Sequence, residues 1–157
     1  FFFKQKTAYE IPKRDWSSDV CSSDLTVDAF VRYWFEHDAV LNDDVVAAVE
    51  RLARHNHLEL YLCTAQEHHR AAFLWNEVGL RRHFRDIWYT ARVGKAKNTP
   101  QFFAAINQAL GVAPEESPLF FDDTEDVVAA ARDAGWDAHV FDSVADLHRH
   151  PHLRDLL

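Results

Sequence analysis

The chain has 157 residues, of which 48% are hydrophobic and 27% charged, and its formal net charge is −8. This length and balance are typical of one globular domain with a core. The acidic charge argues against nucleic acid or an anionic membrane as a partner, and no apolar run is long enough to span a bilayer. The two cysteines, Cys21 and Cys63, are far apart in sequence and suggest neither a disulfide framework nor a zinc-ligand motif, so a reducing, cytoplasmic setting is expected.

The amino-terminal residues 1–25 do not follow the pattern of a helix or a strand. They also lack the apolar region and the cleavage site of a signal peptide. Residues 4–10 and 15–25 resemble translated pieces of a common sequencing adapter. We therefore interpret residues 1–25 as an adapter-like artefact, expect them to be disordered, and expect the natural amino terminus to be missing.

From Thr26 onward, apolar periodicity and capping residues predict alternating helices and strands. Asn42 is expected to cap a helix, as is Thr99 before a proline, whereas Gly79, Gly111 and Gly135 mark helix ends. The predicted helices are 27–37, 45–55, 67–78, 100–110, 125–134 and a tail from 144, and the predicted strands are 58–63, 87–91, 118–122 and 138–141. Short connections between alternating elements predict parallel βαβ units and a doubly wound α/β sheet.

Polar residues follow these strands, where ligands bind in an open parallel sheet. Thr64 and Ala65 follow the first strand, a lysine segment follows the second, and Asp122 and Asp123 end the third. A hydroxyl, a lysine and two carboxylates suit a phosphate group and Mg²⁺. Each feature also has a plain structural explanation, because Thr64 or the aspartates can cap helices and the lysines can be solvated surface charges.

The order of these residues resembles the haloacid dehalogenase (HAD) superfamily, over about residues 42–141. The segments that carry the resemblance are 60–64, an apolar strand ending in Thr, 94–100, a Gly-x-x-Lys segment entering a helix, and 119–123, a strand ending in Asp-Asp. The position of the lysines relative to Pro100 favours Lys97 rather than Lys95 as the functional lysine of this segment. Ala65 and Val127 stand where the family often has Asn, and Asn98 stands where Pro is usual; these departures bear on substrate more than on family.

The resemblance implies catalytic roles for Thr64 and Lys97, which would bind the phosphoryl group together with Ala65. It also implies that Asp123 ligates Mg²⁺ with support from Asp122. The parent protein would then hydrolyse the phosphate ester of a small metabolite through an aspartyl-phosphate. A 2-haloacid dehalogenase-type hydrolase and a noncatalytic HAD-like binding module remain as alternatives, although the acidic pair argues against the dehalogenase.

The family's nucleophile motif, Asp-x-Asp on the first and central strand, does not occur in the chain. We therefore expect residues 42–157 to be a HAD-like core without its first strand, residues 26–41 to be a remnant of a helical cap or linker, and the chain as given to be inactive. The missing strand would leave the first and third predicted strands with unpaired inner edges, or would allow those two strands to pair with each other.

Two further features have a structural interpretation. Cys63 is expected to be a buried thiol rather than a nucleophile. His148, His150 and His152 alternate in the carboxyl-terminal tail, and the sequence favours a mobile tail over a metal site there.

Overall fold

The computed structural model describes residues 26–157. The chain divides into two compact units between Val40 and Leu41. The first unit contains α1 (Val27–Asp38), a helix capped by the hydroxyl of Thr26, which accepts from the amide of Ala29 at 3.2 Å. The prediction that residues 1–25 are an adapter-like artefact lies outside the described residues.

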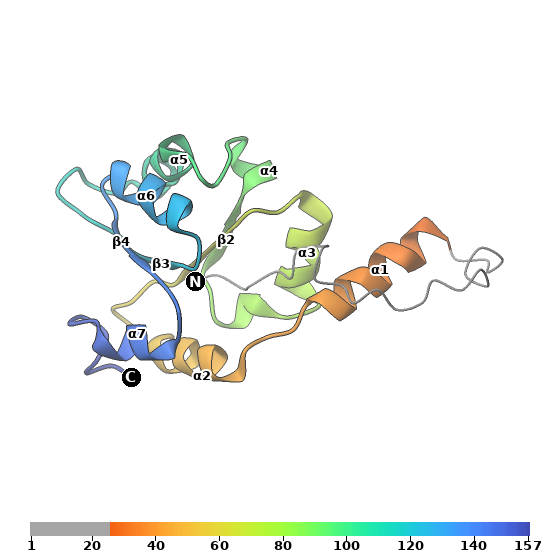
Figure 1. Cartoon of the computed structure of the whole chain (residues 1–157), viewed down its shortest axis with the longest axis horizontal. Helices are drawn as coiled ribbons and strands as arrows, with labels where there is room; N and C mark the ends of the chain where they lie inside the picture. Colours follow the sequence, from red (N-terminus) through yellow and green to blue (C-terminus); the bar gives the residue numbers. More distant parts are fainter. Residues whose placement is uncertain (1–25) are drawn as a thin grey trace. The chain divides into compact units, whose positions relative to one another are not determined.

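Four short strands, in two parallel pairs, form the centre of the second unit (Figure 1). β1 (Tyr61–Thr64) pairs with β2 (Asp86–Tyr89), so that Thr64 lies opposite Tyr89. β3 (Leu119–Asp122) pairs with β4 (Asp137–Val140), so that Asp122 lies opposite Val140. Within residues 26–157 no strand joins β1 to β3, and these two strands do not pair with each other.

The helices of this unit are α2 (Asp43–Leu52), α3 (His68–Asn76), α4 (Thr90–Val93), α5 (Pro100–Leu110), α6 (Glu125–Asp133) and α7 (Val144–Arg149), with a 3₁₀ turn at Leu80–Arg82. All of them except α4 correspond to predicted helices, whereas α4 begins within the predicted strand 87–91. The amides of Asp44 and Val45 both donate to the side chain of Asn42, which confirms the predicted cap of α2. Thr99 precedes α5 as predicted but does not cap it, because its hydroxyl donates instead to the carbonyl of Ala96 at 2.7 Å.

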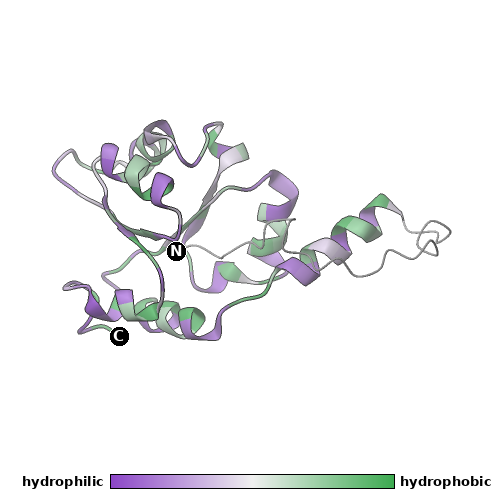
Figure 2. Cartoon of the chain, viewed as in Figure 1, coloured by the Kyte–Doolittle hydropathy of each residue, from purple (hydrophilic) through white to green (hydrophobic). Residues whose placement is uncertain are grey.

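Apolar residues from these elements form clusters on the two faces of the strand layer. Successive side chains of a strand point to opposite faces, and Phe120 and Phe121 of β3 accordingly enter different clusters. Phe120 packs with residues of α5 and α6, whereas Phe121 packs with Leu52 of α2 and Leu147 of α7. Helices therefore cover both faces of the strands, and α2 and α5 show the mixture of apolar and hydrophilic residues expected of such helices (Figure 2).

An apolar cavity of about 420 Å³ lies between the two strand pairs. Its lining includes Tyr61 and Cys63 of β1, and Leu119 and Phe120 of β3. All four strands also contribute to the core cluster of α5 and α6, through Cys63, Trp88, Phe120 and Ala138. The unit is thus an incomplete doubly wound α/β core. Among the described residues β1 pairs only with β2 and β3 only with β4, so the first and third predicted strands each have an unpaired edge rather than pairing with each other.

No helix among residues 26–157 combines the length and the apolar character needed to cross a membrane.

In α1, the aromatic side chains Phe30, Tyr33 and Trp34 are exposed, and Phe35 is buried.

Candidate active site

The centre of the candidate site is a buried ion pair between Lys97 and Asp122. Asp122 is the last residue of β3, and Lys97 lies in the turn between α4 and α5. The Lys97 Nζ atom lies 2.5 Å from Asp122 Oδ2, and the exposed fractions of the two side chains are 2% and 0%. The contact brings together segments that follow β2 and that end β3, so both lie at the carboxyl edge of the strands, where α/β proteins bind ligands. Lys95, two residues away, is exposed.

Thr124 binds both carboxylates of the acidic pair. Its amide donates to Asp122 Oδ1 at 3.1 Å, and its hydroxyl donates to Asp123 Oδ1 at 3.1 Å. Thr124 itself is the residue that precedes α6, and its side chain makes no capping bond to that helix. Asp122 and Asp123 therefore both accept hydrogen bonds from Thr124, and neither is the N-cap of α6. The sequence singled out the two aspartates but not Thr124, although its position directly after them was the available signal.

Asp123 differs from Asp122 in its surroundings. It is half-buried, and burial raises the pKa of its carboxyl, as does the neighbouring charge of Asp122, while the Thr124 hydrogen bond and the charge of Lys97 act in the opposite direction. A raised pKa means that the ionised form is incompletely compensated by the protein. An oxygen ligand of this kind fits a hard divalent cation, which would supply the compensating charge.

Thr64 ends β1 and is buried, with 7% of its surface exposed. It does not cap the next helix, because α3 begins at His68 and its N-cap is Glu67, whose carboxylate accepts from the amides of His69, at 2.7 Å, and Arg70. Ala65 is exposed and precedes α3 rather than forming its first turn. The capping explanation for Thr64 is therefore wrong, and Glu67 binds the amides at the start of α3 instead.

The segment that carries Lys97 is fixed by a feature that the sequence did not reveal. β2 ends at Tyr89, and the chain turns at once into α4, which Gly94 closes at φ +70°. Arg92 of α4 returns to β2, where its guanidinium donates to both carboxylate oxygens of Asp86, at 2.7 and 2.8 Å, and to the carbonyl of Ile87 at 2.7 Å. The same guanidinium lies 4.1 Å from the centre of the Trp88 ring. These contacts hold α4 against β2 and so define where the turn with Lys97 begins.

Cys63 precedes Thr64 and is 2% exposed. Burial raises the pKa of its thiol to about 11. The thiolate, which is the nucleophilic form, is therefore scarce at neutral pH. Cys63 is a core residue in this structure, in line with the interpretation from sequence.

Comparisons with known proteins agree with this architecture. A search of the curated proteins found no match. Among solved structures, the chain is similar to a hydrolase from Streptococcus pneumoniae TIGR4, with a TM-score of 0.60 and 17% sequence identity over 79% of this chain and 67% of that chain. At this identity the similarity shows the fold alone. Residues 4–135 match the haloacid dehalogenase-like hydrolase family, and the chain therefore belongs to this family of hydrolases.

Proposed function

We propose that this chain carries the phosphate-binding and metal-binding part of a Mg²⁺-dependent hydrolase that acts on a small phosphorylated metabolite. The observation that carries the proposal is the buried pair of Lys97 and Asp122, with Asp123 beside it, at the carboxyl edge of the strands. The family comparison supports hydrolysis, and the choice of a phosphate ester rests on these three side chains. The free, buried Cys63 fits a reducing, cytoplasmic setting.

Each residue has a role that follows from its chemistry. The Lys97 ammonium would neutralise charge on the phosphoryl group, and the Thr64 hydroxyl would donate to one of its oxygens. The amide of Ala65 would bind the same group. Asp123 would hold Mg²⁺ directly, while Asp122, which already binds Lys97 and the amide of Thr124, would orient the site. Bound Mg²⁺ would supply positive charge to the phosphate oxygens.

The acidic pair also supports phosphate chemistry over halogen chemistry. A dehalogenase that displaces halide without a metal has no use for a half-buried carboxylate with a raised pKa. Asp123 is such a carboxylate, and it lies beside a second one. The proposal therefore favours phosphate esters over 2-haloacids.

The chain contains no Asp-x-Asp motif, and none of the residues at the candidate site is placed as a nucleophile. In the proposed mechanism an aspartate attacks phosphorus, the bond to the ester oxygen breaks, and water later hydrolyses the aspartyl-phosphate. We therefore expect the 157-residue chain to bind phosphate without turning over an ester. A parent gene that also lacks the motif would instead support a noncatalytic binding module.

The test begins with the DNA upstream of the Thr26 codon. If it encodes an apolar strand followed by Asp-x-Asp, the extended protein should hydrolyse phosphate esters with Mg²⁺ and lose this activity in a chelator. Asp123→Asn should lower kcat/KM by at least about 100-fold, more than the loss typical of residues that only support metal ligands. Asp126→Asn, at an exposed acidic residue of α6, is the matched control and should retain activity. Full activity of Asp123→Asn, or activity unaffected by chelator, would contradict the metal assignment.

A further inference from the structure

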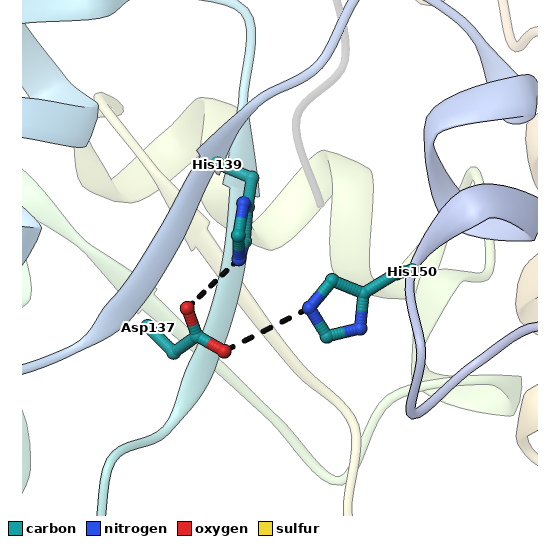
Figure 3. A group of neighbouring side chains, drawn as sticks. All are labelled: Asp137, His139 and His150. Carbon is teal, nitrogen blue, oxygen red and sulfur yellow. Dashed lines mark hydrogen bonds and ion pairs between the residues drawn. The ribbon is translucent and has the colours of Figure 1, made fainter.

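A second cluster of potential ligands lies at the opposite end of β4 from the candidate active site. It consists of Asp137, His139 and His150, and each residue offers one nitrogen or oxygen atom within 4.8 Å of the others (Figure 3). Asp137 begins β4 and pairs with Leu119, whereas Asp122 pairs with Val140 at the far end. Three residues of strand, or about 10 Å, therefore separate the two ends. The cluster is distinct from the proposed Mg²⁺ site.

The positions of these residues in the fold bring their side chains together. Asp137 and His139 are two residues apart on a strand and therefore share a face. The Asp137 Oδ1 atom is 2.8 Å from His139 Nε2. His150 approaches from the other side, directly after α7, and its Nε2 atom lies 3.7 Å from Asp137 Oδ2. Figure 3 shows the carboxylate directed toward both rings.

The surroundings hold the two imidazoles in place. The ring of Phe121 stacks on His139, with centroids 5.4 Å apart, and meets His150 edge-on at 5.6 Å. His150 is 8% exposed, in contrast to the mobile tail histidine that the sequence suggested. Packing against an aromatic ring restricts both side chains and lowers the entropy that a bound ion would cost.

Neither ring nitrogen of His150 makes a hydrogen bond to another described residue, and it is Nε2 that faces Asp137 (Figure 3). Its Nδ1 atom is buried without a hydrogen-bond partner among the described residues. Its Nε2 atom is too far from Asp137 for a hydrogen bond, at 3.7 Å. Two ligands of one tetrahedral zinc ion, each about 2.0–2.1 Å from the metal, lie about 3.3 Å from each other. The separation between His150 and Asp137 is thus close to that of two ligands of a shared ion.

We propose that Asp137, His139 and His150 form a transition-metal site suited to Zn²⁺. Two imidazoles and one carboxylate match this ion, whereas Mg²⁺ prefers oxygen ligands alone. On binding, His139 Nε2 exchanges its contact with Asp137 for the metal. Asp137 and His139 are partly exposed, so a water molecule can complete the coordination. The ion joins the segment after α7 to β4.

The proposal is tested by titrating the full chain with Zn²⁺ alone in a calorimeter, and with Co²⁺, whose visible absorption reports tetrahedral coordination. One ion should bind per chain with micromolar or tighter affinity, and thermal unfolding should move to higher temperature because the ion binds the folded state. His139→Ala removes a partly exposed ligand and should weaken binding by at least about 100-fold. Asp137→Asn should act in the same direction. His148→Ala, at an exposed histidine of α7, should not change Zn²⁺ binding.

Binding that survives His139→Ala and Asp137→Asn unchanged would overturn the proposal, since it would arise from other histidines. Failure of Zn²⁺ to bind the folded chain would overturn it as well. Asp123→Asn should leave Zn²⁺ affinity unchanged, and excess Mg²⁺ should not displace Zn²⁺. These two results keep the outcome independent of the proposed hydrolase function.

Discussion

Replacing Lys97 by Met tests whether the buried ion pair stabilises the fold. The substitution keeps most of the side-chain volume but leaves the carboxylate of Asp122 without its cation. The pair is 2.5 Å apart and almost fully buried, so solvent screens it little. Removing one partner of a buried pair costs about 3–5 kcal/mol. Asp122 keeps the hydrogen bond from Thr124, and we therefore expect a loss near the lower limit, about 3 kcal/mol.

The assay is urea unfolding of four proteins: the unchanged chain, Lys97→Met, Asp122→Asn, and the double variant. Each single variant removes one member of the buried ion pair, whereas the double variant removes both. The double variant should therefore lose much less than the sum of the single losses, with a coupling energy of about 2–3 kcal/mol.

Additive losses, with coupling below about 0.5 kcal/mol, would refute the reasoning, because Lys97 and Asp122 would then stabilise the fold independently. Lys95→Met is the matched control. It removes an exposed lysine from the same segment, and its effect should stay within about 0.5 kcal/mol. A large loss in this control would indicate that the segment is sensitive to any loss of charge.

Three further predictions concern the surroundings of the site. The pKa of Asp86 is lowered, chiefly by its hydrogen bonds from Arg92. The stabilisation from this pair is therefore present above the unfolded pKa of 3.8 and is lost as the pH falls through the folded pKa. Arg92→Ala should remove this acid-sensitive stabilisation, about 0.5 kcal/mol for a partly exposed pair, as measured by urea unfolding at neutral and acidic pH. Phe103→Ala should cost about 3–5 kcal/mol in urea unfolding, because the ring is fully buried and contacts Trp136 with centroids 5.0 Å apart; a loss below 1 kcal/mol would contradict this packing. Gly111→Ala should lower the free energy of unfolding by about 1 kcal/mol from its φ of +68° alone, since the added carbon would lie in open space, more than 4 Å from described atoms beyond its local backbone.

Local chemistry predicted most elements of this fold. Asn42 has a side chain that accepts helix amides, Pro100 fits a first helical turn, and Gly111 tolerates the left-handed backbone at a helix end. Strand ends were less predictable, because a strand is defined by its partner. The apolar run from Leu58 predicted a strand, yet only Tyr61–Thr64 pairs with β2, while Leu58 and Leu60 pack in the core on the face of α2 and α7.

The site shows the same division between local and long-range information. The sequence placed Lys97 and Asp122 at the strand ends, but their contact joins residues 25 apart and depends on how α4 turns the chain. Nothing near His150 in sequence indicated that its ring would be buried against Phe121 and Asp137. That position results from the packing of α7, whose Leu147 is fully buried.

The arrangement of the strands in two pairs has a consequence for cooperativity. β1 and β2 are joined through α3, and β3 and β4 through α6, so each pair forms from a short stretch of chain at low entropic cost. Among the described residues, no backbone ladder transmits unfolding from one pair to the other. The connection runs through side chains, chiefly those of α5, whose Phe102, Phe103 and Ile106 belong to the core shared by all four strands. The two pairs should therefore behave as separate units in amide exchange, with α5 as the element that joins them.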